Sequence, residues 1–261
     1  MGEGKKIYFA SDAHFGLDLK ESPIESERRF VRWLDSIKHE TAALYLLGDM
    51  FDYWFEYKSV VPKGYTRFLG KLAEFTDAGI PVYIFTGNHD IWMFDYLPKE
   101  TGVTVITEPI EVELYGKRFY LAHGDGLGDP SRVFRLMRWF FRNKFCQFLY
   151  KILHPRLTVP FGYAWSKHNR KKKIDRETAK YMGEDKEYLV QFAKEYLKNH
   201  NVDYFIFGHR HVMLDLMLPD RKQVVMLGDW IDNFSFAVFD GKELFLDQLH
   251  TQVSHYPNML K

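Results

Sequence analysis

Five short apolar runs, each closely followed by polar residues typical of metal sites, constrain this fold more than any other feature of the sequence. A short apolar run bounded by turn residues predicts a buried strand. Helical patterns over about 24–38 and 66–77 separate the first three runs, so the first third predicts a β-α-β-α-β unit with a mostly parallel sheet. The five runs are 7–10, 43–47, 82–85, 120–122 and 205–207.

Later in the chain, strand patterns follow one another through short turns. Turns such as Tyr115-Gly116-Lys117 are typical of hairpins, so we expect these strands to pair antiparallel. A second sheet, packed face to face on the first and flanked by helices, would accommodate both patterns. We interpret the whole chain, 1–261, as one domain. The later strands are expected over about 110–115, 118–122, 224–228, 234–240 and 243–247.

The region 131–200 contains no convincing strand pattern. Within 131–153 large apolar residues such as Val133, Leu136 and Phe140 fall at helical spacing, and a second helix is expected over about 175–198. The region separates two of the motif-bearing loops. Helical insertions of this length in compact folds often act as lids, so we interpret 131–200 as a lid.

Composition excludes several classes of protein. The single cysteine, Cys146, excludes a disulfide framework and a Cys-rich zinc site, and it favours a reducing compartment. The first residues hold no apolar signal region, and no stretch approaches the roughly 18 uncharged apolar residues that span a bilayer. We therefore expect neither a Sec-type signal nor a transmembrane helix, while peripheral membrane contact stays open.

Side chains with metal-binding atoms follow all five runs, where the carboxyl ends of the strands form the usual ligand position of an open α/β sheet. Imidazole, carboxylate and amide donors together suit Mn, Fe or Zn. One carboxylate can bridge two metal ions that lie roughly 3.5–4 Å apart. Such a pair of ions activates water and stabilises the attacking and the leaving oxygen in phosphoryl displacement. The residues alone therefore predict a two-metal site for phosphoryl transfer. The motifs are Asp12-x-His14, Gly48-Asp49-x-x-Asp52, Gly87-Asn88-His89-Asp90, His123-Gly124-Asp125 and Gly208-His209-x-His211.

This set of motifs resembles the calcineurin-like metallophosphoesterase superfamily. The resemblance implies a four-layer α/β/β/α sandwich with a dinuclear metal site. It also implies that His89 protonates the leaving oxygen or stabilises the phosphoryl group, and that Asp90 orients His89. The implied ligands of one ion are Asp12, His14, Asp49 and His211, and those of the other are Asp49, Asn88, His123 and His209, with Asp49 bridging.

The net charge of +1 hides an uneven distribution of charge. Residues 131–173 hold 12 Lys and Arg and no Asp or Glu, so the rest of the chain has a net charge of −11. Large aromatic residues are interleaved with the basic ones. The segment could be a solvated basic face with its aromatics in the core, a nucleic-acid surface, or an amphipathic helix on an anionic lipid surface. Its richness in large apolar residues favours lipid.

The residues within three of the motifs are similar to those of the UDP-2,3-diacylglucosamine diphosphatase family. These are S-D-A-H-F at 11–15, G-D-M-F-D-Y-W at 48–54 and H-G-D-G-L at 123–127, with a helical insertion following the last. The resemblance implies cleavage of the pyrophosphate of UDP-2,3-diacylglucosamine to UMP and 2,3-diacylglucosamine 1-phosphate (lipid X), a step of lipid A biosynthesis. It further implies Mn²⁺ as cofactor and a cytoplasmic enzyme attached peripherally to the inner membrane, with the lid over the acyl chains.

The same resemblance implies a set of substrate contacts. Many family members have Arg where this chain has His89, and Arg carries a fixed charge whereas His titrates, so the role of position 89 stays open. We expect no nucleic acid and no obligate protein partner. A phosphoesterase acting on nucleic acid or another nucleotide remains the alternative, and a non-catalytic metal-stabilised module is the third. The implied substrate contacts are Trp54, Asn88, His89, Asp129, Ser166, Arg170 and Lys173.

Overall fold

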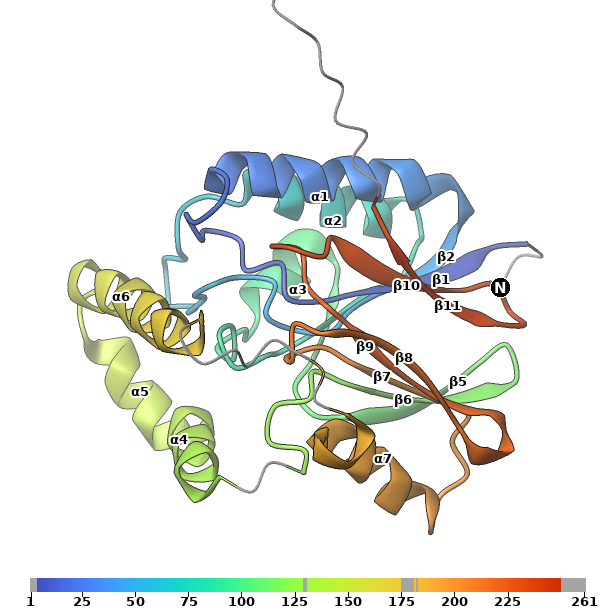
Figure 1. Ribbon diagram of the computed structural model, residues 1–261. Coiled ribbons are helices and arrows are strands. Elements are labelled where there is room, and N and C mark those ends of the chain that lie inside the picture. Colours follow the sequence, from blue (N-terminus) through green and yellow to red (C-terminus); the bar gives the residue numbers. More distant parts are fainter. Residues whose placement is uncertain (1–3, 129–130, 175–180, 182, 250–261) are drawn as a thin grey trace, which may run out of the picture.

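The computed structural model describes residues 4–128, 131–174, 181 and 183–249, and these form two sheets packed face to face (Figure 1). The six-stranded sheet has the order β11-β10-β1-β2-β3-β4, and the five-stranded sheet has the order β5-β6-β7-β9-β8. The first sheet contains β1 (Lys6–Ala10), β2 (Thr41–Leu46), β3 (Val82–Phe85), β4 (Thr104–Ile106), β10 (Ser235–Phe239) and β11 (Leu244–Gln248). The second contains β5 (Ile110–Leu114), β6 (Lys117–Ala122), β7 (Tyr204–Phe207), β8 (Met213–Leu218) and β9 (Lys222–Leu227).

Helices cover the outer face of each sheet, which confirms the four-layer α/β/β/α prediction. Apolar residues of α1 (Pro23–Ile37), α2 (Thr66–Asp77) and α3 (Tyr96–Thr101) join one core cluster with the first sheet. Those of α7 (Tyr188–Leu197) join another cluster with the second sheet. The central cluster lies between the sheets, where the rings of Phe9 and Phe119 stack with their centroids 5.8 Å apart. Short 3-10 turns occupy Lys38–Glu40, Glu184–Lys186 and Pro219–Arg221.

Strand direction follows the prediction in the first sheet and departs from it in the second. Strands β1 to β4 pair parallel, and β10 and β11 pair antiparallel. The hairpins expected at the short turns are antiparallel, β5 with β6 and β10 with β11. The expectation of antiparallel pairing is wrong elsewhere among the later strands, because β6 and β9 also pair parallel with β7, and β9 and β10 lie in different sheets. Strands β4 and β8 were not predicted, because both lie at sheet edges and lack a continuous buried apolar run.

The insertion is helical, but its helices are divided differently from the prediction. The one helix expected over 131–153 is two, α4 (Arg132–Arg142) and α5 (Lys144–Ile152), because the side chain of Asn143 accepts the N–H of Phe145 and starts a new helix. A third helix, α6 (Pro155–Ile174), was not predicted. Of the helix expected over about 175–198, α7 lies at its end, while 175–180 and 182 are outside the described residues.

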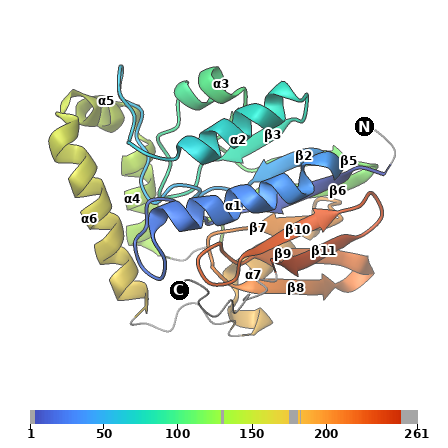
Figure 2. The ribbon, with the colours of Figure 1, turned by 90° about the horizontal axis from the view of Figure 1, so that it is seen from above.

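Seen from above, α4, α5 and α6 form a wall at one end of the two sheets (Figure 2). This is the end where the polar motifs follow the strands. Among the described residues, no helix is long and apolar enough to cross a membrane.

Candidate metal centre

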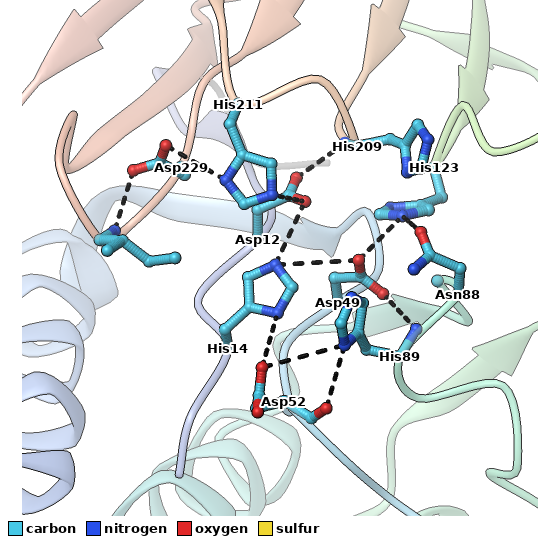
Figure 3. A network of polar contacts seen from close by, with 12 residues as sticks. Asp12, His14, Asp49, Asp52, Asn88, His89, His123, His209, His211 and Asp229 are labelled. Atoms are coloured by element: carbon cyan, nitrogen blue, oxygen red, sulfur yellow. Dashed lines mark hydrogen bonds and ion pairs between the residues drawn. The ribbon is translucent and has the colours of Figure 1, made fainter. Parts of the chain in front are cut away.

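The five motifs converge at the carboxyl ends of β1, β2, β3, β6 and β7 (Figure 3). Backbone hydrogen bonds hold the loops in register beyond the strands. Within one sheet the N–H of Asp12 donates to the carbonyl of Gly48 at 3.0 Å, and within the other the N–H of Gly208 donates to that of His123 at 2.9 Å. Residues almost 200 positions apart therefore meet because the parallel strands of both packed sheets have their carboxyl ends at the same end of the sandwich.

Asp12, His14 and His211 form one group with the spacing of ligands around a cation. Oδ1 of Asp12 lies 3.7 Å from Nε2 of His14 and 3.5 Å from Nε2 of His211. Two ligand atoms that each lie about 2.1 Å from one ion are roughly 3–3.6 Å apart, close to these distances. Oδ1 of Asp12 is buried and accepts no hydrogen bond from the described residues, so a cation would satisfy it.

Asp49, His123 and His209 form a second group. Oδ2 of Asp49 lies 3.3 Å from Nε2 of His123, and the amide oxygen of Asn88 lies 3.4 Å from the same nitrogen. The structure thus brings together the four residues implied for the second ion.

Asp49 stands between the two groups. Its Oδ2, which faces His123, is also 3.8 Å from Nε2 of His14, while its Oδ1 accepts the backbone N–H of His89 at 2.8 Å. One carboxylate oxygen thus faces an imidazole of each group. This geometry suits a bridging ligand.

Each of three histidines has a second partner behind its ring. Nδ1 of His14 faces the carboxylate of Asp52 at 3.5 Å, and Nδ1 of His123 faces the carbonyl of Leu47 at 2.8 Å. Nδ1 of His211 faces the carboxylate of Asp229 at 3.3 Å. Such partners fix the tautomer of a metal-binding imidazole and leave its Nε2 for the ion.

Asp229 is a site residue that the sequence analysis missed. Although burial raises its pKa, hydrogen bonds from His211 and from the N–H groups of Asp232 and Asn233 lower it to about 2. The signal was present, because Gly228 and Asp229 follow an apolar run at 224–227 in the same manner as the other motifs.

The electrostatics of the site favour bound cations. Burial lowers the pKa of His123, but the neighbouring Asp49 and Asp12 carboxylates outweigh burial and raise the pKa to about 10. Burial also opposes ionisation of Asp12 and Asp49, yet the surrounding imidazoles lower both pKa values. Ionised carboxylates among imidazoles form a hard to intermediate donor set that suits a divalent ion such as Mn, Fe or Zn.

The backbone at the candidate ligands is held in an uncommon conformation. Asp12, His14, Asp49, His209 and His211 have φ values of 56°, 46°, 52°, 69° and 55°. This left-handed region is unfavourable for residues with a side chain and persists where the surroundings over-determine it, often at functional sites. The strain therefore coincides with the residues that converge on the site.

The contacts of Asp90 in this structure are with the backbone and not with the ring of His89. The buried carboxylate of Asp90 accepts four backbone N–H groups from the two loops on either side of the site. The donors are Gly87 at 2.7 Å, Met50 at 2.8 Å, and Asp49 and Phe51 at 3.2 Å each. Burial and the charge of Asp49 raise the pKa of Asp90 to about 7, against the effect of these donors.

The ring of His89 is oriented by Asp52 and by the insertion. Its Nδ1 lies 3.1 Å from the carbonyl oxygen of Asp52 and 3.2 Å from the hydroxyl of Ser166 in α6. Ser166 is buried. A residue of the insertion therefore reaches the polar centre of the site.

Trp54, which the resemblance implies as a substrate contact, is a buried residue of the core in this structure. Its side chain is fully buried, stacks on Phe51 at a centroid distance of 4.4 Å and donates its indole N–H to Glu56 at 3.2 Å. The carboxylate of Glu56 also accepts the N–H of Tyr96 at the start of α3. Trp54 thus packs beneath the loop after β2 through its contacts with Phe51 and Glu56.

The side chains of the other implied substrate contacts are not described. Asp129 is not described, and Arg170 and Lys173 are described only as backbone of α6.

Helix α4 turns its basic face toward the sheets and its apolar face away. Nε of Arg138 pairs with the buried carboxylate of Asp125 at 2.9 Å, and Arg142 donates to the carbonyl of Thr107 at 2.9 Å. By contrast, 67% of Leu136 and 52% of Phe140 are exposed. The interpretation of a solvated basic face with its aromatics in the core is therefore wrong for α4, whereas Tyr150 and Tyr163 do pack on a buried cluster.

The insertion is joined to the rest of the protein through aromatic and hydroxyl groups. Tyr163 of α6 hydrogen-bonds to Tyr65 at 2.6 Å, and Tyr150 of α5 to Tyr53 at 3.1 Å. Between α4 and the loop after β6 lies a cavity of about 550 Å³. Its lining residues are Gly126, Arg135, Arg138, Trp139, Arg142 and Asn143.

Comparisons with known proteins identify the family of this chain. The calcineurin-like phosphoesterase family matches residues 5–213. A UDP-2,3-diacylglucosamine hydrolase of Porphyromonas gingivalis is 47% identical over 255 residues, which cover 94% of this chain and 97% of that protein. A protein of the same name from Histophilus somni is 27% identical and covers 87% of this chain and 92% of its own length. Among solved structures, the phosphoesterase Yfce from E. coli has 16% identity, covers 95% of this chain and 94% of its own, and has a TM-score of 0.46. The chain therefore belongs to the calcineurin-like phosphoesterase family and shares its family with the P. gingivalis hydrolase.

Proposed function

We propose that this protein hydrolyses UDP-2,3-diacylglucosamine at its pyrophosphate. Water adds across one P–O bond of the P–O–P link, giving UMP and 2,3-diacylglucosamine 1-phosphate (lipid X) in lipid A biosynthesis. The observation that carries the proposal is the 47% identity to the P. gingivalis UDP-2,3-diacylglucosamine hydrolase over nearly the full length of both chains. The grouping of ligands around Asp49 supports it independently.

Two divalent ions, Mn²⁺ in our proposal, would be held by the residues that the structure groups together. Asp12, His14 and His211 would hold one ion, and Asn88, His123 and His209 the other, with Asp49 between them. When bound, such a pair would lower the pKa of a water molecule and stabilise the charge on the attacking and the leaving oxygen of the displacement. The donor set fits, because the buried Asp12 oxygen has no hydrogen-bond donor among the described residues.

His89 would act on the phosphoryl group. Because its Nδ1 faces the carbonyl of Asp52 and the hydroxyl of Ser166, we assign its Nε2 to the substrate. There it would protonate the leaving oxygen or stabilise the phosphoryl charge. Ser166, Asn88, Asp129, Arg170, Lys173 and Trp54 remain our proposed substrate contacts.

The exposed apolar face of the insertion fits an acylated substrate. Large apolar side chains are solvent-exposed on all three helices, and a solvated surface of this kind would be unfavourable without a partner. We propose that this face, which we call the apolar lid face, covers the acyl chains and contacts the cytoplasmic side of the inner membrane. Its members are Val133, Leu136, Trp139, Phe140, Phe145, Phe148, Leu149, Ile152, Leu153, Leu157, Phe161 and Trp165.

Nucleic acid is a poorer fit to the same helices. Phosphate backbones need accessible Lys and Arg. Arg138 and Arg142 of α4 are engaged with Asp125 and Thr107 of the sheet loops, and the exposed basic residues of the three helices lie among large exposed apolar side chains. The outward face of α4 is apolar instead.

The test compares two substrates in the presence of Mn²⁺. UDP-2,3-diacylglucosamine should be hydrolysed to UMP, and UDP-N-acetylglucosamine, which has the same pyrophosphate without the two long acyl chains, should be hydrolysed far more slowly. Equal turnover of the two would contradict the lipid assignment. Asp49→Ala should abolish turnover, whereas Asp95→Ala, which alters an exposed carboxylate that pairs with Lys99, should leave it unchanged.

A further inference from the structure

The residue between the two candidate ligands His209 and His211 is an arginine that forms a two-point ion pair. Nε of Arg210 donates to Oε1 of Glu187 at 2.8 Å, and one terminal nitrogen donates to Oε2 at 3.1 Å. The Glu187 side chain is 2% exposed and that of Arg210 19%. A paired fork of this kind fixes orientation as well as distance.

The ion pair lies where the insertion returns to the sheets. Glu187 directly precedes α7, and the Arg210 guanidinium also lies 5.6 Å from the ring centroid of Tyr188. A Cβ on Gly128, just before the insertion, would stand 2.8 Å from the carbonyl oxygen of Tyr188. The two ends of the insertion therefore meet beside the 208–211 loop.

The 208–211 loop carries one candidate ligand of each of the two groups. His209 and His211 both have positive φ, and they belong to different ligand groups around Asp12 and Asp49 (Figure 3). Strained backbone persists only where neighbouring contacts over-determine it. The N–H of His209 donates to Asp12 and the ring of His211 meets Asp229, but both contacts lie within the site. The fork of Arg210 ties the loop to the elements outside it.

We propose that Glu187 and Arg210 are positioning residues: their ion pair sets the 208–211 loop so that one histidine faces each ion, and it makes metal affinity depend on the end of the insertion. This inference rests on the assignment of His209 and His211 as ligands in the proposed function. Neither residue touches substrate or ion in this scheme. Both act through the histidines.

The test measures metal binding by the full-length chain rather than hydrolysis. Glu187→Gln and Arg210→Lys are titrated with Mn²⁺ by calorimetry and with Co²⁺ by visible absorption, whose bands report histidine ligation. Both variants should bind about 10–100-fold more weakly than the wild type, as is typical when a residue behind the ligands is lost. The lysine keeps the charge but not the fork. Glu184→Gln is the matched control, because Glu184 forms a more exposed pair with Lys194 of α7 and should bind metal like the wild type.

A double variant separates positioning from stability. Removing one partner leaves a lone buried charge and lowers stability, whereas replacing both with apolar residues is often neutral. Glu187→Leu with Arg210→Met should therefore recover the melting temperature of the metal-free protein and still bind metal weakly. Recovery of wild-type affinity and Co²⁺ spectrum in this variant, or wild-type affinity in Glu187→Gln, would overturn the proposal. If the wild type bound no metal, the ligand assignment itself would fail. The substrate comparison tests the hydrolase assignment separately.

Discussion

The carboxylate of Asp90 accepts the backbone N–H of Asp49 at 3.2 Å, and so connects the loop after β3 to the loop after β2. The same carboxylate accepts the N–H groups of Gly87, Met50 and Phe51. One buried side chain therefore holds together the two loops that place Asp49 and Asn88. Its role is structural support of the ligands, which leads to the first of five predictions.

Asp90→Asn should destabilise the fold by about 1–3 kcal/mol, because the amide nitrogen turns a donor toward N–H groups that need an acceptor. Urea unfolding of the metal-free protein measures the change. Asp95→Asn is the control: Asp95 is 68% exposed at the surface, so its substitution should change stability by less than about 0.5 kcal/mol. Equal effects of the two substitutions would contradict the assigned role of Asp90.

Gly87→Ala should weaken metal binding by about 10–100-fold, because a Cβ at Gly87 would lie 2.1 Å from Oδ1 of Asp49 and 2.5 Å from its backbone nitrogen. The neighbour includes backbone and cannot move aside at low cost. In Gly70→Ala the new Cβ meets nothing within 4 Å on α2, so this variant should gain about 0.5–1 kcal/mol of stability and bind metal normally. Calorimetric titration with Mn²⁺ measures the metal affinity of the Gly87→Ala and Gly70→Ala variants and distinguishes them.

His89→Ala should lower kcat by about 10²–10⁴-fold, the usual contribution of a positioned proton donor. Metal content, measured by elemental analysis of the purified protein, should stay at the wild-type value. This comparison matters because His89 also lies within ligand distance of His14 and Asp49. Loss of one metal equivalent in His89→Ala would show that His89 is a ligand and not the proton donor proposed above.

The double substitution Leu136→Ser and Phe140→Ser in α4 should raise KM for the diacylated substrate at least about tenfold, because each buried CH₂ contributes about 0.8 kcal/mol. Folding should be unaffected, since 67% and 52% of these side chains are exposed. Binding to anionic vesicles, measured by co-sedimentation, should fall as well. Phe245→Ser provides the comparison, because Phe245 is 45% exposed on β11 rather than on the insertion. An equal rise in KM there would rule out a specific role for the apolar lid face.

Asp203 should make stability fall as the pH drops below the pKa of an unfolded Asp, about 3.9. Burial raises the pKa of its carboxyl, but the N–H of Arg118 at 2.9 Å and the ammonium of Lys222 at 3.1 Å outweigh burial and lower it below the usual value. The stabilisation is therefore complete above the pKa of an unfolded Asp and is lost as pH falls through the lower folded value. Unfolding curves from pH 6 to pH 3 should show a smaller loss of stability in Asp203→Asn than in the wild type. Parallel pH profiles would contradict this linkage.

The elements that local sequence determines were predicted well, and those that depend on distant partners were not. Helices α1 and α2 lie within a residue of their predicted bounds, because amphipathic spacing is a local property. The break between α4 and α5 depends on the Asn143 side chain turning back to cap a helix, which spacing alone does not reveal. The pairing of β6 and β9 with β7 depends on which strands meet in space, so turn length between neighbours in sequence could not predict it.

The same division runs through the candidate site. Local sequence is enough to identify which ligand-type residues follow each strand, because apolar runs define strand ends and parallel strands end at one edge. The relations between side chains of different loops depend on how distant segments pack together. In the folded protein the carboxylate of Asp90 accepts backbone N–H groups, and the ring of His89 contacts the carbonyl of Asp52 and the hydroxyl of Ser166. The side chain of Trp54 is buried in the core. The basic face of α4 lies against the sheets. The physical reason is that spacing within one segment determines which side chains share a face, while the partners of that face come from segments far away in the chain.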